Sequence, residues 1–208
     1  MHVSISDSEP GRRTQAERRA RTRAALLEAA ARGFSRYGYG NLVLEKVASE
    51  AGYTRGALYH LFAGKEELAL AVVDWVAERW EQEVWRPAQD AGAPVDVLIA
   101  LGRGHVVFCR RDVARVMMAL RVEFDGRDHP VGARVAEIGR DLAKRFGAIV
   151  AAGRRDGSIP PGPPAKLLGA AITAAVEGLA IHLGGVPHDA AMAERMVRGL
   201  LGVPPKRG

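Results

Sequence analysis

The sequence contains one cysteine in 208 residues, Cys109, and its aromatic residues make up only 6% of the chain. A single cysteine excludes an internal disulfide and a cysteine-based zinc cluster, and it agrees with a reducing compartment. The longest apolar stretch, residues 167–183, is interrupted by glycine and carries Glu177 and His182, so no clean membrane span of about 20 residues is present. The N-terminus lacks the apolar segment of a signal peptide. We therefore expect a cytoplasmic protein without a membrane partner.

The composition is that of a soluble globular chain, with 48% hydrophobic and 26% charged residues. The net charge of the chain is +6, and residues 12–36 alone carry a net charge of +6, because this segment contains eight arginines and two glutamates. The arginines are Arg12, Arg13, Arg18, Arg19, Arg21, Arg23, Arg32 and Arg36. A basic cluster of this kind suits a polyanion, usually nucleic acid and less often an acidic membrane surface.

Helical spacing of apolar residues recurs along the chain, whereas period-two alternation and fixed repeats are absent. We expect a mobile tail over residues 1–13 and an all-α fold after it. The expected helices cover residues 14–37, 44–51, 54–61, 65–86, 94–110, 112–124, 131–155, 165–183 and 189–201. Glycines at 38 and 40 supply the first stop, and Pro87 is expected to end the fourth helix.

The second and third expected helices form a helix-turn-helix pattern after a longer basic helix. Val47 and Ala48 face inward, Gly52 allows a tight turn, and Leu58 and Phe62 supply apolar anchors. This arrangement leaves an outer face that can contact phosphates, and an arginine there can also read guanine. The outer residues are Thr54, Arg55, Ala57, Tyr59 and His60.

Gly56 and Lys65 add to this interpretation. Glycine inside a helix costs about 1 kcal/mol relative to alanine, and close approach of another backbone would explain it. Lys65 stands in the first turn of the next helix, where the dipole disfavours a cation unless a phosphate lies beside it. The alternative is that both are tolerated surface residues.

Residues 29–68 closely resemble the DNA-binding domain of the tetracycline-repressor (TetR) family. The matching elements are Ala29-Ala30, Phe34, Gly38-Tyr39, Val47-Ala48, Ala51-Gly52, Thr54-Arg55-Gly56-Ala57-Leu58-Tyr59, Phe62, Lys65-Glu66 and Leu68. Leu42 and Val43 depart from the pattern, since family members often have a capping threonine or serine there, and Leu61 replaces a common histidine.

The resemblance implies about nine helices, of which the first three bind double-stranded DNA and the rest form a ligand pocket and a dimer interface. The implied division is 14–64 for DNA binding, 65–203 for ligand binding and dimerisation, and a tail over 204–208. The implied DNA-contacting residues are Thr54, Arg55, Gly56, Ala57, Tyr59, His60 and Lys65. The implied function is a repressor that a small hydrophobic effector releases from DNA.

The helix over 165–183 is apolar nearly all round, which predicts a homodimer, and two-fold symmetry then requires a palindromic operator. Small residues, including Gly169 and Gly178, would let a partner helix come close. The alternative is that this helix is simply the core of one chain. The expected interface residues are Leu168, Ile172, Val176, Leu179, Met192, Met196 and Leu200.

A mostly apolar effector pocket is expected inside the C-terminal domain, although each of its residues could equally be ordinary core. The expected lining is Trp75, His105, Phe108, Met117, Met118, Arg121, Phe124, Phe146, Glu177 and His182. The expected effector is a medium-sized hydrophobic molecule with one or two polar groups. No cofactor or metal is expected.

Two other classes of protein remain. A small helical enzyme would draw on His105, Cys109, Glu123, Glu177 and His182, but no pair has metal-ligand spacing and no nucleophile motif or phosphate-binding loop occurs. A membrane-surface module would need large apolar residues opposite the arginines, where residues 14–25 offer mainly alanine. We expect no catalytic residues.

Overall fold

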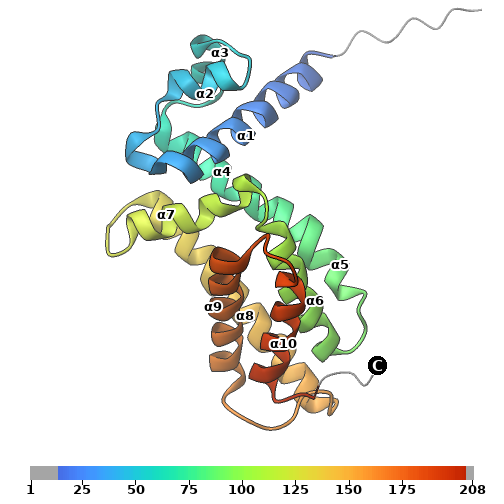
Figure 1. Ribbon diagram of the computed structural model, residues 1–208. Helices are drawn as coiled ribbons and strands as arrows, with labels where there is room; N and C mark the ends of the chain where they lie inside the picture. The colour runs from blue at the N-terminus through green and yellow to red at the C-terminus, as the bar shows by residue number, and fades with distance from the viewer. Residues whose placement is uncertain (1–13, 205–208) are drawn as a thin grey trace, which may run out of the picture.

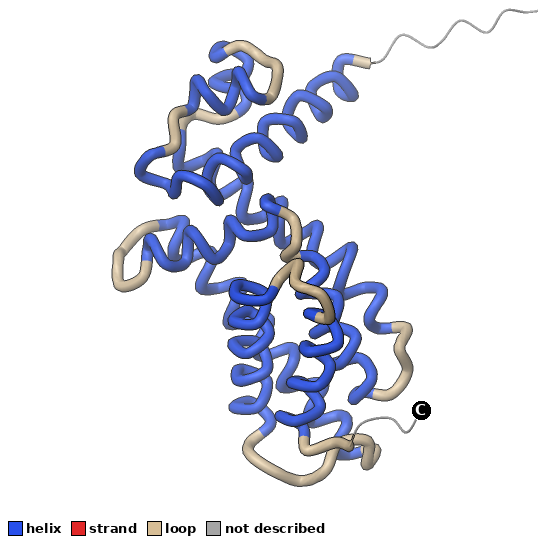
Figure 2. The backbone as a smooth tube through the Cα atoms, in the orientation of Figure 1, coloured by secondary structure: helices blue, strands red, loops and turns tan. Residues whose placement is uncertain are grey.

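The computed structural model describes residues 14–204. The tail predicted at residues 1–13, with Arg12 and Arg13, and residues 205–208 lie outside this range. Every regular element within the range is a helix, which confirms the all-α expectation (Figures 1 and 2). When the continuous run of α4, η1 and α5 is taken as one helix, the described part contains nine α-helices.

The N-terminal unit consists of α1 (Gln15–Asn41), α2 (Leu44–Glu50) and α3 (Arg55–Leu61). Thr14 begins α1 with a capping box, in which its hydroxyl accepts from the Glu17 N–H and the Glu17 carboxylate accepts from the Thr14 N–H. Gly38, with a φ of 74°, kinks α1 near its end, and helical turns resume to Asn41. The predicted stop at Gly38 is therefore a bend.

The rest of the chain follows the predicted order. Its elements are α4 (Lys65–Trp80), η1 (Glu81–Trp85), α5 (Arg86–Gln89), α6 (Pro94–Phe108), η2 (Asp112–Arg115), α7 (Val116–Phe124), α8 (Pro130–Arg155), α9 (Ala165–Leu183) and α10 (Asp189–Leu201). The bounds of α9 and α10 are those predicted, because each is flanked by glycine or proline that limits the helix.

The predicted stop at Pro87 is wrong, since the helix that begins at Lys65 continues to Gln89. Proline in a regular α-helix clashes with the carbonyl four residues back. Here η1 is a π turn, in which the Arg86 N–H donates to the Glu81 carbonyl five residues back. The wider turn displaces the carbonyls and admits the proline ring.

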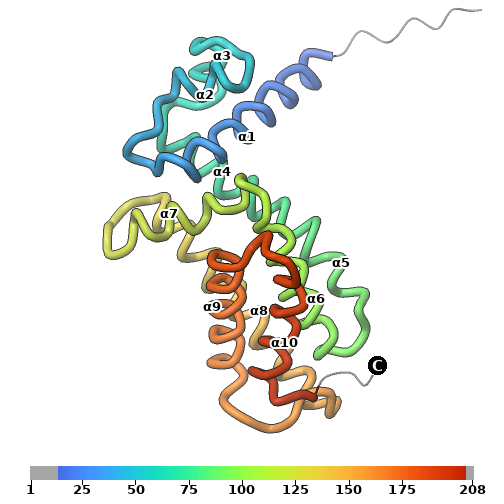
Figure 3. The backbone as a smooth tube through the Cα atoms, in the orientation of Figure 1, coloured from blue at the N-terminus to red at the C-terminus, as the bar shows by residue number. Residues whose placement is uncertain are grey.

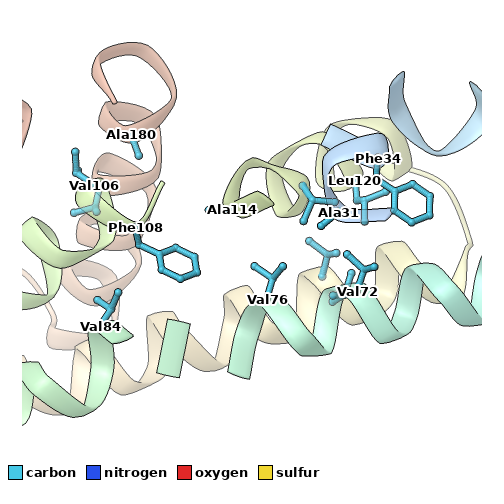
Figure 4. Packing of buried hydrophobic residues seen from close by; sticks show 14 of the residues in the cluster. Ala31, Phe34, Val72, Val76, Val84, Val106, Phe108, Ala114, Leu120 and Ala180 are labelled. Carbon is cyan, nitrogen blue, oxygen red and sulfur yellow. The ribbon is translucent and has the colours of Figure 1, made fainter. Parts of the chain in front are cut away.

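One continuous core joins the N-terminal unit to the rest of the chain. Ala31 and Phe34 of α1, Val72 of α4 and Leu120 of α7 pack together (Figure 4). The C-terminal part of α1 lies against α7 as well as α4 (Figure 3). The N-terminal unit is therefore held by α7 in addition to α4, the helix that leads out of it.

The closest helix pair is α8 and α9. A Cβ at Gly169 would lie 2.4 Å from the backbone nitrogen of Gly147, so the two backbones touch. The sequence suggested that Gly169 makes room for a partner chain, whereas the neighbour is α8 of the same chain. This contact fixes which face of α9 points inward.

By length and hydropathy, α9 is also the one helix in residues 14–204 that is long and apolar enough to cross a membrane. The core helix of a soluble protein meets the same criterion. In this structure α9 packs against α6, α8 and α10. Its Glu177 forms an ion pair with Arg121 of α7.

Candidate functional site

The outer face of α3 carries the polar side chains that the sequence predicted there. Thr54 caps the helix, and its hydroxyl accepts from the Ala57 N–H at 3.2 Å. Arg55, Tyr59 and His60 are exposed. The Arg55 guanidinium lies 3.1 Å from a Glu45 carboxylate oxygen and 5.2 Å from the centre of the Tyr59 ring. These contacts hold the side chain on the surface, where it remains 66% exposed.

Gly56 lies in the first turn of α3 with open space around it. A Cβ there would meet only the Thr54 hydroxyl, at 3.8 Å, and the backbone has no positive φ. Nothing among the described residues therefore requires glycine at this position. Leu58 is fully buried and anchors the opposite side of the helix.

The beginning of α2 shows the departure noted from the sequence. Val43 occupies the N-cap position and makes no side-chain capping bond. Its side chain is exposed, while that of Leu42 is buried against Gly33. The helix-turn-helix thus has a side-chain cap on α3 and none on α2.

The described arginines of α1 fall into two groups. Arg32 pairs with Glu28, and Arg36 pairs with Asp112 of η2 at 2.9 Å. Arg18, Arg19, Arg21 and Arg23 are exposed and form no ion pair with any described acidic residue. The unpaired positive charge is thus concentrated in the first half of α1.

Lys65, which was expected to contact a phosphate, forms hydrogen bonds within the chain. Its ammonium donates to the carbonyls of Tyr39 and Gly40 at 3.0 Å each, and it lies 5.4 Å from the centre of the Tyr39 ring. These bonds occupy two of its three donors. Lys65 therefore fastens the end of α1 to the beginning of α4.

Glu123 of α7 holds the same segment of α1 from the other side. Its carboxylate accepts from the backbone N–H groups of Tyr39 at 2.5 Å and Gly40 at 2.7 Å. A Cβ at Gly38 would lie 2.7 Å from the same carboxylate. The sequence had raised Glu123 only as a candidate enzymatic carboxylate, because a contact 84 residues away in the chain leaves no local pattern.

Between α4, α6, α7, α8 and α9 lies a cavity of two adjacent chambers, each about 260 Å³. The residues that line both chambers are His105, Cys109, Ala114, Met117, Arg121 and Glu177. One chamber extends to Met118 and to Ile181 of α9. The other extends to Trp80, Ile138 and Leu142.

His105 is neutral in the wall between the chambers. Burial, aided by the positive charge of Arg121, lowers the pKa of its imidazole to about 4. The Trp80 indole N–H donates to His105 Nδ1 at 3.1 Å, so the ring proton resides on Nε2. That nitrogen lies 3.4 Å from the Cys109 sulfur. Burial raises the pKa of the Cys109 thiol to about 12, which keeps it protonated.

Arg121 and Glu177 face each other across the same wall, with the guanidinium donating to the carboxylate at 2.5 Å. Burial raises the pKa of Glu177, and the charge and hydrogen bond of Arg121 oppose this rise. A Cβ at Gly139 would lie 2.8 Å from Arg121 Nη2, so the guanidinium rests on the backbone of α8. The described residues hold no cluster of metal-ligating side chains.

Six of the ten predicted ligand-binding residues line the chambers, namely His105, Phe108, Met117, Met118, Arg121 and Glu177. The other four do not. Trp75 stacks with Arg79, Phe124 stacks on His129, Phe146 stacks on Trp85, and His182 is exposed. Helical spacing alone did not separate aromatic residues that pack elsewhere from those that face the cavity. Trp80, Ile138 and Leu142 were missed for the same reason.

The residues predicted at the dimer interface also differ in their burial within one chain. Leu168, Ile172 and Val176, which were expected at a dimer interface, are already buried within one chain. Leu179, Met196 and Leu200 are partly buried against the core, and Met192 is 45% exposed. A different stripe of α9 is open, running from Leu167 through Ala174 to Ile181.

The family model described as "Bacterial regulatory proteins, tetR family" matches residues 26–72, from α1 into α4. The A-factor receptor protein of Streptomyces griseus is 31% identical over 134 residues, which span 60% of this chain and 46% of that protein. The chain thus spans less than half the length of this relative. The HTH-type transcriptional repressor BepR of Brucella suis biovar 1 (strain 1330) is 29% identical over 71% of this chain and 73% of its own.

The fold extends the likeness beyond the helix-turn-helix. The crystal structure of AibR in complex with isovaleryl coenzyme A and operator DNA superposes with a TM-score of 0.69 at 21% identity, covering 88% of this chain and all of that one. The helix-turn-helix with its exposed α3 face, the matching family model and the shared helical architecture agree. Residues 26–72 thus match the tetR family of bacterial regulatory proteins, and the helices that follow share their fold with solved structures such as AibR.

Proposed function

We propose that the protein is a cytoplasmic, homodimeric repressor that leaves a palindromic operator when a small hydrophobic effector enters the cavity. The exposed α3 face carries this proposal, because Arg55, Tyr59 and His60 extend from a helix anchored by buried Leu58. The names of two relatives, a receptor and a repressor, support the two halves of the proposal. Residues 14–64 then form the DNA-binding domain, and residues 65–203 form the effector-binding and dimerisation domain.

The DNA-contacting set that we propose is Thr54, Arg55, Gly56, Ala57, Tyr59 and His60. Arg55 is the residue that reads a base, because its side chain is exposed and its partner Glu45 is itself a surface residue. The open space at Gly56 lets a phosphate backbone approach α3 closely. Lys65 contributes by holding α1 and α4 together.

The dimer that we propose uses the open stripe of α9 together with Met192 of α10. Leu167 is 61% exposed and Ile181 is 49% exposed, although both are large apolar residues. Ala174 lies between them on the same face and allows close helix approach. Two copies related by a two-fold axis would cover this surface and present two α3 helices to one face of the duplex.

The route from effector to DNA that we propose passes through α7. Arg121 lies in the cavity wall, and Glu123, two residues later, holds the backbone of Tyr39 and Gly40. A shift of α7 on effector binding therefore moves the end of α1. A 100-fold loss of operator affinity requires about 2.7 kcal/mol of preference of the effector for the shifted state.

The test begins by selecting operator sequences from random duplexes with the full-length protein. Arg55→Ala is then expected to weaken binding to the selected operator by about 1–3 kcal/mol and to relax base preference at one position of each half-site. Arg103→Ala removes an arginine that pairs with Glu194 far from α3 and serves as the matched control. Failure to enrich any sequence, or equal binding by the Arg55→Ala variant, would reject the proposed function.

A further inference from the structure

We propose that the cavity takes an uncharged organic molecule, whose oxygen acceptor, of the carbonyl class, binds the Nε2–H of His105 while its apolar body fills the chambers. This assignment rests on the proposed function, whose effector it specifies. Under this assignment, carboxylates and amines of the same size are not the preferred ligands.

The wall between the chambers carries no uncompensated charge. Arg121 and Glu177 neutralise each other at hydrogen-bonding distance, and His105 is neutral because its pKa lies near 4. A carboxylate would face Glu177 and an amine would face Arg121. Either ion would lose its hydration without gaining a free counter-charge, a cost of several kcal/mol.

The charged groups farther along the cavity lining do not supply a free counter-charge for an ionic ligand either. Arg145 forms two bonds with Glu81, at 2.8 and 3.1 Å, and lies over the Trp85 ring. Arg134 pairs with Asp74 and Glu137. Arg115 borders one chamber and Asp141 the other, and both are solvent-exposed. Solvent screens such exposed charges, so they attract an ion only weakly.

One donor in this wall lacks a strong acceptor. The Nδ1 atom of His105 is occupied by the Trp80 indole, which places the proton on Nε2. The nearest partner of Nε2 is the Cys109 sulfur at 3.4 Å, and a thiol is a weak acceptor. A ligand oxygen would satisfy this donor better than the sulfur does. The same atom cannot act as an acceptor, so a ligand with only donor groups gains nothing there.

The apolar residues of the lining determine the shape and polarity of the rest of the ligand. Trp80, Phe108 and Ile138 enclose one chamber, and Met117 lines both. Two chambers of about 260 Å³ that share a wall suit a molecule with its polar group in the middle or near one end. Methionine and aromatic side chains fit such bodies without demanding one shape.

Four probes with ten carbons separate charge from size, namely decan-2-one, decanoate, decylamine and decane. Binding to the full-length protein is measured without DNA, by tryptophan fluorescence and calorimetry. Decan-2-one is expected to bind at least about tenfold more tightly than either ion and than decane, the difference expected for one buried hydrogen bond or an uncompensated charge. Equal or tighter binding of an ion, or no binding of any probe, would overturn the assignment.

Three variants test the donor. His105→Phe, which keeps a planar ring and removes the N–H, is expected to lose about tenfold in ketone affinity and little in decane affinity. His105→Gln restores a donor and retains an acceptor for Trp80, so it is expected to recover ketone binding. His182→Phe changes an exposed histidine outside the chambers and is the control. Unchanged ketone affinity in His105→Phe would refute the assignment.

Operator release is measured separately, with the selected duplex. Ketone binding that follows the predicted pattern but never releases DNA leaves the ligand class standing and rejects the repressor mechanism. Release by decanoate or decylamine in preference to the ketone rejects the ligand class and leaves the repressor mechanism standing.

Discussion

At the scale of single residues, we expect substitution of Gly56 to have opposite effects on stability and on DNA binding. Its Cβ position is open, and its backbone is helical. Gly56→Ala is therefore expected to stabilise the protein by about 0.5–1 kcal/mol. The same methyl group would stand between α3 and a DNA backbone, so operator affinity is expected to fall. Thermal unfolding and gel shift measure the two effects.

Gly199→Ala is the control for the stability measurement. Gly199 is an exposed glycine in α10 that also has open space around it, so its replacement shows the gain in stability expected at a helical site away from α3. A Gly56→Ala variant that gains stability and binds DNA as tightly as the wild type would show that no backbone approaches α3 there.

Lys65 gives a second prediction at this scale. Lys65→Met keeps the apolar stem and removes both bonds to the carbonyls of Tyr39 and Gly40. We expect a loss of about 1–3 kcal/mol in the free energy of unfolding, because hydrogen bonds from a charged donor are lost. Operator binding is expected to weaken while its salt dependence stays the same.

Salt titration of operator binding separates this role from a direct phosphate contact. If the ammonium neutralised a phosphate, the slope of log affinity against log salt would flatten by about 0.9 in the variant. A flattened slope with unchanged stability would restore the role that the sequence suggested for Lys65.

At the scale of elements, α7 connects the cavity to the helix-turn-helix unit. Glu123→Gln retains the size of the side chain and removes its charge, which weakens its hold on the Tyr39 and Gly40 amides. We expect hydrogen exchange at these two amides to accelerate by about tenfold or more, as expected for the loss of about 1.5 kcal/mol or more. Operator affinity is expected to fall with it.

Asp125→Asn removes an exposed carboxylate immediately after α7 and is the matched control. If exchange at Tyr39 and Gly40 were equally slow in Glu123→Gln and wild type, α7 would not hold α1 through this carboxylate.

At the scale of the whole molecule, the open stripe of α9 predicts the oligomeric state. Ala174→Glu places a charge in the middle of that stripe without entering the core, since the residue is exposed in one chain. Burying this unpaired charge is strongly unfavourable, so we expect sedimentation velocity to show monomers and operator affinity to drop. Ala148→Glu, on the exposed side of α8, is the control. A dimer that persists in Ala174→Glu would place the interface elsewhere.

The sequence by itself determined the position of most helices and the outer face of α3. Apolar spacing of three and four residues is a local feature, as are the cap at Thr54 and the turn at Gly52. The spacing located α9 and α10, and together with the cap and the turn it located α2 and α3, without knowledge of distant neighbours. The outward position of Arg55 follows from the same spacing, once Leu58 points inward. Local patterns of this kind specify a helix and its faces.

Only the tertiary structure decided which apolar faces meet. Ile172 and Val176 turned inward because α8 and α9 touch at Gly147 and Gly169, a contact between segments distant in the chain. The same long-range packing brought Trp80 to His105 and Glu123 to the end of α1. An apolar helix is equally suited to a partner chain or to its own core, so its sequence alone does not choose between them.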